Sequence, residues 1–334
     1  MEQIQSRTAS TKPRPALRLV KTKAMPREEW LAVRKCGIGS SDAVAAVGLS
    51  PYKSQLELWM EKTGRDAALP KADTQDEESP LYWGNILEPI VAAHYTKRSG
   101  NRVRRVNAVL QHPSAEFSWM LANIDREVIG AEDVQILECK TAGINGARLW
   151  KEGVPEYVQL QVMHQLAVTG KQAADVAVLI AGQHVEIHRI ERDDFLIGRL
   201  MRLEQQFWHY VETDTPPPAD GSASAELALR TLFPQDNGET LDFSQDTSLS
   251  AAFAELQAVR EILATHEQRE AQLKQAIQQA MGDATKATFE TGSVTWKKAR
   301  DSESIDLKRL LQDHPELQAQ YTVIKPGSRR FLIA

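Results

Sequence analysis

Residues 119–140 read WMLANIDREVIGAEDVQILECK, and the predicted fold is built outward from this stretch. Its pattern predicts two β-strands, over residues 120–128 and 134–140. Between them the chain reads Gly-Ala-Glu-Asp from Gly130 onward, which is typical of a tight turn. The stretch therefore predicts an antiparallel β-hairpin.

The register of this hairpin decides which side chains meet. A turn centred between residues 131 and 132 places Asp125 opposite Glu138, and alternation along the strand puts Lys140 on the same face as Glu138. A shift by one residue would move Asp125 to the other face, so the prediction depends on the register. Two neighbouring carboxylates repel each other and would hold their protons unless a cation lay between them. Mg²⁺ suits such a site, because it takes one or two carboxylates together with water and phosphate oxygens.

These residues, with a metal ion, would form a site for hydrolysis of a phosphodiester bond. Lys140 would orient or deprotonate the attacking water, or offset negative charge in the transition state. The pattern of Asp125 followed by Glu-X-Lys is weakly specific by itself. The same residues also fit an ordinary edge hairpin with solvated charges.

Length and composition limit the class of protein. A chain of 334 residues predicts one large domain with an appendage. The net charge of −5 excludes a basic protein that coats DNA, so any nucleic-acid contact must come from local basic patches or through metal ions. Only two cysteines, Cys36 and Cys139, are present, which excludes a disulfide framework and a four-cysteine metal site. Together with the lack of a long apolar run or a signal-peptide core, this leads us to expect a protein of the reducing cytoplasm.

A glycine-rich turn follows a basic N-terminal segment. Residues 1–26 are rich in Lys, Arg, Ser and Thr, and we expect a flexible basic arm there. In residues 34–52, the candidate N-cap residues Ser40, Ser41 and Asp42 precede a helix, and such a helix start is suited to binding an anion. Arg34 could clamp a phosphate with two hydrogen bonds. A plain capped helix explains the segment equally well.

Two predicted helices carry further candidate residues. In the helix over residues 82–100, Glu88 adjoins an apolar stripe, and it would be a third metal ligand if it points into a cleft rather than to solvent. We expect that stripe to be buried, with the residues Leu87, Ile90, Val91, His94 and Tyr95. In the helix over residues 156–170, Gln159 and Gln161 lie beside an apolar face, and Gln165 falls on the same side as Gln161. The amides suit a metal-bound water or a phosphate, but surface glutamines are the equal alternative.

The order of elements predicts the fold class. The predicted order is two helices, three strands, a helix, two strands and a helix. This order predicts an α/β (α+β) domain, with a mixed central β-sheet flanked by helices. Further predicted strands cover residues 101–111, 173–180 and 183–190, with 173–180 central in the sheet. We expect the core at 27–213, a linker at 214–247 and a C-terminal appendage at 248–334. The stretch 248–281 predicts a helical hairpin or a short coiled coil rather than one rod, followed by a small α+β tail.

Five segments in order resemble the YqaJ-like viral recombinase family, the phage lambda-type exonucleases of the PD-(D/E)XK nuclease superfamily. The resemblance covers roughly residues 27–213 and implies a restriction-endonuclease-like core. The chain has Ile124 before Asp125 where the superfamily name suggests proline, which is a common departure. The segments are RKCGIGSSDAVAAVGLSPY (34–52), WGNILEP (83–89), ANIDREV (122–128), ILECKTA (136–142) and PEYVQLQVMHQLAVTG (155–170).

The resemblance implies a role for each matching residue. The two cysteines argue against relatives that carry an iron–sulfur cluster. The matches are Asp125 and Glu138 as metal ligands, Glu88 as the helix glutamate, the carbonyl of Cys139 as a further ligand, Lys140 as the catalytic lysine, Gln159 and Gln161 as the glutamine motif, and Arg34 and Ser41 as residues that hold the phosphate at a DNA 5′ end.

The implied activity is a Mg²⁺-dependent 5′→3′ exonuclease on linear double-stranded DNA, with Mn²⁺ expected to substitute. Such an enzyme exposes 3′ single strands for a single-strand annealing protein, and its relatives form ring-shaped trimers around DNA. We expect a phage or prophage protein in the cytoplasm of a bacterial host. A structure-specific DNA endonuclease and a non-catalytic DNA-binding recombination scaffold are the alternatives.

Overall fold

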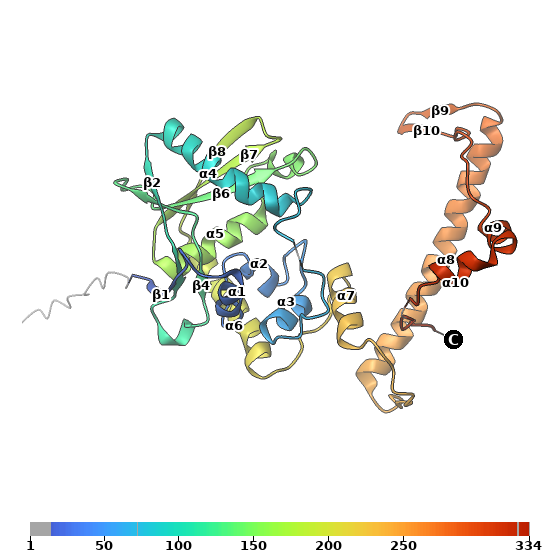
Figure 1. The fold of residues 1–334 in the computed structure, drawn as a ribbon, viewed down its shortest axis with the longest axis horizontal. Coiled ribbons are helices and arrows are strands. Elements are labelled where there is room, and N and C mark those ends of the chain that lie inside the picture. Colours follow the sequence, from blue (N-terminus) through green and yellow to red (C-terminus); the bar gives the residue numbers. More distant parts are fainter. Residues whose placement is uncertain (1–14, 72, 326, 334) are drawn as a thin grey trace, which may run out of the picture. The chain divides into compact units, whose positions relative to one another are not determined.

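The computed structural model describes residues 15–71, 73–325 and 327–333 of the chain (Figure 1). The chain divides into two compact units, of which the first ends at Pro234 and the second begins at Gln235. In the described residues, no helix combines the length and apolar character that a bilayer span requires.

A five-stranded sheet forms the centre of the first unit. Its order is β2-β5-β6-β7-β8, and only the β6–β7 pair is parallel. The predicted class, a mixed sheet flanked by helices, is therefore confirmed. The central strand is β6, with β7 next to it rather than in the middle. The strands are β2 (Arg102–Arg105), β5 (Arg126–Ile129), β6 (Ile136–Ala142), β7 (Ala173–Ile180) and β8 (His184–Glu191).

Helices of the first unit begin and end at local sequence signals. The hydroxyl of Ser54 accepts a hydrogen bond of 3.1 Å from the N–H of Glu57 and so caps α3. Gly170, in the left-handed conformation at φ +67°, ends α5. The helices are α1 (Arg27–Lys35), α2 (Ala43–Ala46), α3 (Gln55–Lys62), α4 (Pro80–Ser99), α5 (Glu156–Thr169), α6 (Asp194–Glu212) and α7 (Ala223–Leu232), with 3₁₀ turns at Ala115–Phe117 and Ala147–Trp150.

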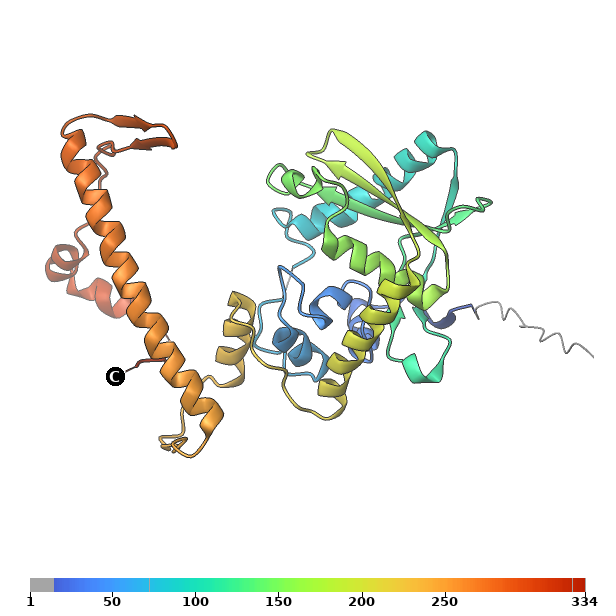
Figure 2. The ribbon, with the colours of Figure 1, turned by 180° about the vertical axis from the view of Figure 1, so that it is seen from behind.

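The two faces of the sheet are covered by different helices, as seen from both sides in Figures 1 and 2. On one face, Leu137 of β6 packs in a cluster with Val91 and Tyr95 of α4. On the other, Ile136 belongs to the larger core that includes Val162 of α5. Neighbouring residues of β6 thus face opposite layers, as alternation requires.

Part of the predicted apolar stripe on α4 is exposed. Val91 and Tyr95 are buried, but Ile90 is 57% exposed and His94 is also exposed. Successive residues differ by 100° around a helix, so the side that meets the sheet includes only some members of a broad stripe.

A second, three-stranded sheet corrects three predictions. Its order is β1-β3-β4, with strands Leu17–Lys21, Ala108–Gln111 and Leu121–Ala122. The predicted strand 101–111 is therefore divided between β2 and β3, and the predicted strand 120–128 between β4 and β5. Residues 17–21 of the predicted flexible arm are a paired strand, and residues 1–14 of that arm lie outside the described residues. Alternation has the same period in either sheet, so it does not reveal where the chain crosses from one to the other.

Helix α7 lies inside the segment predicted as a linker. It is capped by Ser222, and its Ala225 and Ala228 are buried. The oxygen of Ser224 accepts a hydrogen bond of 2.7 Å from the N–H of Ser54, at the start of α3. The first unit therefore extends past the predicted core limit at residue 213.

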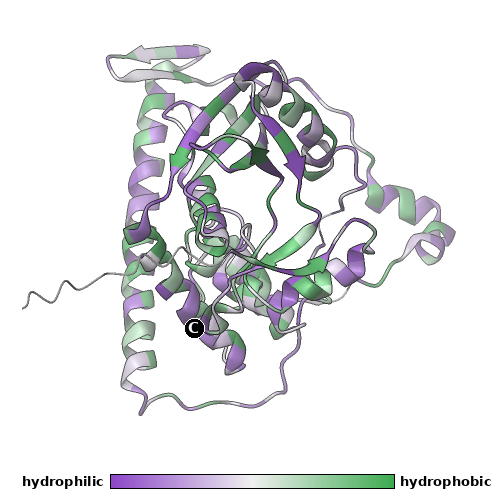
Figure 3. Ribbon diagram, turned by 90° about the vertical axis from the view of Figure 1, so that its left-hand side faces the viewer, coloured by the Kyte–Doolittle hydropathy of each residue, from purple (hydrophilic) through white to green (hydrophobic). Residues whose placement is uncertain are grey.

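The second unit is built on one long helix. The stretch predicted as a hairpin or short coiled coil forms α8 (Thr247–Met281), a single helix in which hydrophilic and hydrophobic residues occur along the whole length (Figure 3). Within the predicted small α+β tail, residues 329–333 form no strand. The remaining elements are β9 (Lys286–Phe289), β10 (Gly292–Thr295), α9 (Leu307–Asp313) and α10 (Pro315–Tyr321).

Candidate active site

The hairpin that carries the candidate site has the register that the sequence predicts. Arg126 of β5 pairs with Leu137 of β6, so Asp125, one residue earlier, comes opposite Glu138. The ladder ends at Arg126, and Oδ2 of Asp125 accepts a hydrogen bond of 2.8 Å from the backbone N–H of Cys139. This bond holds the Asp125 carboxylate beside β6.

Glu138 is a buried carboxylate, 3% exposed, that three side chains hold in place. Its Oε1 accepts hydrogen bonds from Nζ of Lys140 at 2.7 Å and from Nε2 of Gln161 at 2.6 Å. Its Oε2 accepts one from Nε2 of Gln165 at 2.8 Å. Lys140 also donates to Oε1 of Gln161 at 2.9 Å. Both glutamines come from α5, so the site lies on the α5 face of the sheet.

The charges of the site shift the pKa values of its members. Burial and the negative charge of Glu138 raise the pKa of Asp125 to about 8, and Glu88 acts in the same direction. Burial also raises the pKa of the Cys139 thiol, with Asp125 and Glu138 adding to the effect. For Lys140, burial opposes the charged form, but Glu138 outweighs it and raises the pKa of the ammonium. When Asp125 is ionised as well as Glu138, the site holds more negative charge than Lys140 balances.

Glu88 is paired with two arginines. Its Oε1 accepts hydrogen bonds from Nη2 of Arg105, at 3.3 Å, and from Nη1 of Arg126. The buried Arg126 also donates to the backbone carbonyl of Asp125 at 2.7 Å. Arg126 thus links α4 to the segment that carries Asp125. Arg126 was assigned no role from the sequence. Its position directly after Asp125 was the signal that could have identified it as part of the site.

The predicted glutamines have different environments. Gln161 contacts Glu138, but Gln159 is exposed and its amide donates to the carbonyl of Val154 at 2.6 Å. The structure therefore does not bring Gln159 into the cluster. Gln165 takes part instead, one helical turn after Gln161. Spacing of four residues on one helix face was the signal for it.

Helix α5 also holds the segment that leads to Asp125. The amide of Gln165 donates to the carbonyl of Asn123 at 3.3 Å. Nε2 of His164 lies 2.9 Å from the carbonyl oxygen of Leu121, and its Nδ1 lies 2.8 Å from Oε1 of Glu204. His164 and Glu204 are fully buried. Two consecutive residues of α5 thus fix β4 and the residue that follows it.

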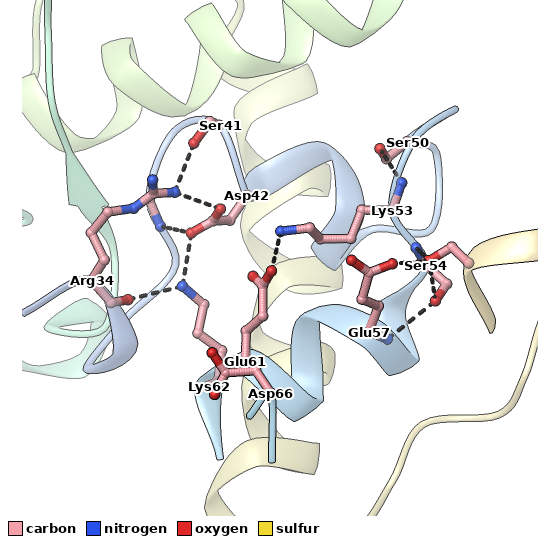
Figure 4. A network of polar contacts seen from close by, with 12 residues as sticks. Arg34, Ser41, Asp42, Ser50, Lys53, Ser54, Glu57, Glu61, Lys62 and Asp66 are labelled. Atoms are coloured by element: carbon pink, nitrogen blue, oxygen red, sulfur yellow. Dashed lines mark hydrogen bonds and ion pairs between the residues drawn. The ribbon is translucent and has the colours of Figure 1, made fainter. Parts of the chain in front are cut away.

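A second polar cluster lies where α1 ends and α2 begins (Figure 4). Nη2 of Arg34 donates to Oγ of Ser41 at 2.8 Å and to Oδ1 of Asp42 at 2.6 Å. The guanidinium lies over the ring of Trp30, 4.9 Å from its centroid. Ser40 is buried, and its hydroxyl has no hydrogen-bond partner in the described part of the chain. Arg34 and Ser41 are thus in direct contact, whereas Ser40 lies beside them without a partner.

Asp42 is the N-cap residue of α2, but its carboxylate does not cap the helix. Its Oδ2 accepts hydrogen bonds from the N–H of Gly39 at 3.3 Å and from Nζ of Lys62 at 2.7 Å. Lys62 also donates to the backbone carbonyl of Arg34 at 2.8 Å. Of the three candidate N-cap residues, Asp42 takes the position and Ser40 and Ser41 do not, and the Asp42 carboxylate pairs with cations instead of capping the helix.

The oxygen donors of the first cluster fit a hard divalent cation. Among the described residues, Oδ1 of Asp125 accepts no hydrogen bond, and the raised pKa of Asp125 reports negative charge that a cation would balance. Residues 15–71, 73–325 and 327–333 contain no group of three or more His, Cys, Asp or Glu side chains placed to hold a metal ion. Two carboxylates, with water and phosphate oxygens, are the set that Mg²⁺ usually takes.

Solved structures similar to this one include two exonucleases. An alkaline exonuclease from Laribacter hongkongensis is 24% identical, with a TM-score of 0.45, over 56% of this chain and 93% of that chain. A phage-related exonuclease from Haemophilus somnus is 10% identical, with a TM-score of 0.38, over 53% of this chain and 96% of that chain.

Sequence comparison gives the family. Residues 29–172 match the YqaJ-like viral recombinase domain. The uncharacterized protein YqaJ of Bacillus subtilis (strain 168) is 35% identical over 304 residues, which span 90% of this chain and 92% of that protein. With this identity over nearly the whole of both proteins, the chain belongs to the family of YqaJ-like viral recombinases.

Proposed function

We propose that this protein is a divalent-metal-dependent nuclease that degrades linear duplex DNA from its 5′ ends. The observation that carries the proposal is the cluster in which Asp125, directly before β5, is bound to the N–H of Cys139 beside Glu138 of β6, with Lys140 and Gln161 bound to Glu138. Acidic residues for a metal ion and a cation for the phosphate are what hydrolysis of a phosphodiester requires.

Each residue of the cluster has a proposed role. Asp125 and Glu138 would hold Mg²⁺, or Mn²⁺ in its place, with the carbonyl of Cys139 as a further oxygen donor. Glu88 would contribute the oxygen that Arg105 and Arg126 do not bind. When bound, the ion would supply an activated water and balance charge on the phosphate. Because the pKa of Lys140 is raised, its ammonium stays protonated at neutral pH. Lys140 would orient the attacking water and offset negative charge on the phosphate, and a cation bound at the carboxylates would lower its pKa and so favour removal of a proton from that water.

The end of the DNA is proposed to bind at the second cluster. Arg34, with Ser40 and Ser41, would hold the 5′ phosphate. The guanidinium is already oriented by Trp30 and Asp42, and its Nε and Nη1 donate to no residue in the described ranges. A fixed guanidinium with unused donors suits two hydrogen bonds to a phosphate.

The proposed products are 3′ single strands, which a strand-annealing protein would pair during recombination of phage type. A trimeric ring around DNA, in the cytoplasm of a bacterial host, is the assembly that the family resemblance leads us to expect. A ring would keep the enzyme on DNA without a strongly basic surface. This fits a chain with a net charge of −5.

Digestion of three duplex substrates tests the proposal. Linear DNA with a 5′ phosphate, linear DNA with a 5′ hydroxyl and closed circular DNA would be incubated with Mg²⁺, Mn²⁺ or a chelator. We expect that only the linear DNA with a 5′ phosphate is degraded, and that it loses the phosphorylated strand. Chelator and Lys140→Ala should abolish this degradation, and Arg34→Ala should slow it strongly. Cutting of closed circles would instead indicate an endonuclease. Intact DNA in every reaction of the wild type would indicate a DNA-binding scaffold.

A further inference from the structure

Three charged side chains from different elements meet beside the glycine-rich turn (Figure 4). The side chains of Asp42 and Lys62 are 6% and 4% exposed, and that of Arg34 is 23% exposed. Each oxygen of Asp42 serves a different cation, since Oδ1 binds Arg34 and Oδ2 binds Lys62. Burial disfavours the Asp42 carboxylate, yet Lys62 and Arg34 hold its pKa well below the usual range. The two cations therefore favour the ionised form of Asp42, which links them through its two oxygens.

Lys62 fixes Arg34 at two points. Its Nζ binds the Asp42 carboxylate, which in turn binds the guanidinium. The same Nζ also donates to the backbone carbonyl of Arg34 in the last turn of α1. Lysine often satisfies free carbonyls at the end of a helix. Because Lys62 belongs to α3, the orientation of Arg34 is set from outside the turn that contains Ser41 and Asp42.

The arrangement leaves one positive charge and unused donors. Two cations and one anion give a net charge of +1 in a largely buried place. The guanidinium lies so close over Gly39 that a Cβ there would be 3.5 Å from Nε and Nη2 of Arg34. The buried hydroxyl of Ser40 lacks a partner within the described residues. Excess positive charge, free guanidinium N–H groups and an unpaired hydroxyl are complementary to a phosphate group.

We infer that Asp42 and Lys62 are positioning residues, which hold Arg34 so that the protein distinguishes a terminal phosphate from a hydroxyl. The inference rests on the proposed function, and it extends it to two residues that act only through Arg34. Asp42 occupies Nη2 and so leaves Nε and Nη1 for the phosphate. Lys62 prevents Asp42 and the end of α1 from moving apart.

The test compares binding of duplex ends in the presence of a chelator, so that no strand is cut. Fluorescence anisotropy would give the Kd for a blunt duplex with a 5′ phosphate and for the same duplex with a 5′ hydroxyl. Asp42→Asn and Lys62→Met should each reduce the preference for phosphate by about tenfold, the equivalent of one charge-assisted hydrogen bond. Binding of the hydroxyl end should change by less than about twofold, because that end makes no contact with Arg34.

Lys35→Met is the matched control. Lys35 follows Arg34 on α1 and pairs with Asp66 at 2.7 Å, so the variant removes the same charge without touching Asp42. It should weaken binding of both ends equally and keep the preference. An unchanged preference in folded Lys62→Met would overturn the inference, as would a parallel loss for both ends. Thermal melting establishes folding, and if Asp42→Asn is unfolded, Lys62→Met alone decides.

The inference and the proposed function fail in different ways. Equal affinity of the wild type for both ends would overturn the inference, while metal-dependent cleavage would still support a nuclease. Absence of cleavage with Mg²⁺ or Mn²⁺ would overturn the proposed function, while a phosphate preference measured with chelator, and lost in Asp42→Asn, would still support the positioning roles.

Discussion

Nε2 of Gln165 donates to Oε2 of Glu138 at 2.8 Å, and both side chains are buried. Oε1 of Glu138 is already bound by Lys140 and Gln161. Gln165 is therefore the residue that fixes the second oxygen, and it also holds the carbonyl of Asn123. The two sides of the candidate site, β6 and the segment before β5, are joined by this one amide. Supporting hydrogen bonds of this kind set the orientation of a ligand carboxylate.

Gln165→Leu should lower the rate of DNA cleavage by about 10- to 100-fold, the usual effect of losing a group that orients a metal ligand. Gln159→Leu is the matched control, because Gln159 is exposed on the same helix and binds only the carbonyl of Val154. The control should stay within about twofold of the wild type, as for most surface substitutions. Initial rates at saturating linear DNA measure both. Equal rates for the two variants would remove Gln165 from the site.

The raised pKa of Asp125, about 8, predicts how the metal-free protein responds to pH. Between the ordinary aspartate pKa and this value, the folded state binds a proton that the unfolded state has released. The free energy of unfolding therefore falls as pH rises from about 4 to about 8. Asp125→Asn removes this contribution, so with chelator present the variant should gain stability relative to the wild type as pH rises. Melting temperatures at pH 5, 7 and 9 measure it.

Excess Mg²⁺ provides the control for this prediction. A cation at the carboxylates favours their ionised form, so it should stabilise the wild type at pH 8 and have little effect on Asp125→Asn. If the melting temperatures of both proteins change in parallel with pH, Asp125 is ionised without metal and the electrostatic argument is wrong.

The sequence was sufficient for features that depend on local rules. The register of the β5–β6 hairpin follows from its turn, and alternation correctly puts Lys140 on the same face as Glu138. The helix predicted over residues 156–170 ends at Gly170, whose left-handed conformation follows from the backbone freedom of glycine. These signals act within a few residues, so no knowledge of tertiary packing is needed.

Features that depend on distant contacts could not be predicted. The sequence alone makes Gln159 and Gln161 equally good candidates for the site. Which of them contacts Glu138 depends on the direction from which α5 packs against β6. The partner of Asp42 is Lys62, on another helix, and a lysine in the last turn of a helix carries no signal that it will be buried. Likewise, the bend before Asp125 lies inside a continuous strand pattern, because the chain changes sheets without changing its alternation.

The buried pair of His164 and Glu204 should be a large contributor to stability. Both ring nitrogens of His164 face oxygen atoms, of Glu204 and Leu121, which favours the doubly protonated ring. Burial opposes this charge, but Glu204 outweighs it and raises the pKa of His164. The stabilisation is complete below the unfolded histidine pKa and is lost as pH rises through the raised folded value.

Glu204→Gln should therefore destabilise the protein by about 3–5 kcal/mol at pH 6, as expected when one partner of a buried ion pair is removed. The deficit should shrink as pH rises, since the neutral imidazole no longer needs the carboxylate. Urea denaturation at pH 6 and pH 9 measures the difference. A deficit that is the same at both pH values would mean that His164 is neutral in the folded protein. Glu226→Gln, which removes an exposed carboxylate paired with Arg230 on α7, is the control.

The first unit ends at Pro234, shortly after α7. Helix α7 packs on α3, and Ser224 contacts both Ser54 and Glu57 at the start of α3. A fragment ending at Pro234 keeps this contact, so it should cleave linear DNA at a rate close to that of the full chain. A fragment ending at Thr213 loses α7 and the bidentate pair of Arg65 with Asp214. Because α3 also carries Lys62, the shorter fragment should melt at a lower temperature and lose its preference for 5′-phosphorylated ends.

Melting temperatures and the ratio of Kd values for the two duplex ends test this comparison. Ser224→Ala in the full chain is the point variant, and it should cost about 1–3 kcal/mol of stability, as expected when a hydroxyl that bonds both Ser54 and Glu57 is removed. Equal melting temperatures and end preferences of the two fragments would show that α3 is held without α7. A loss of stability with an intact preference would show that Lys62 stays in place when α7 is removed, and that α3 alone is sufficient to orient Arg34.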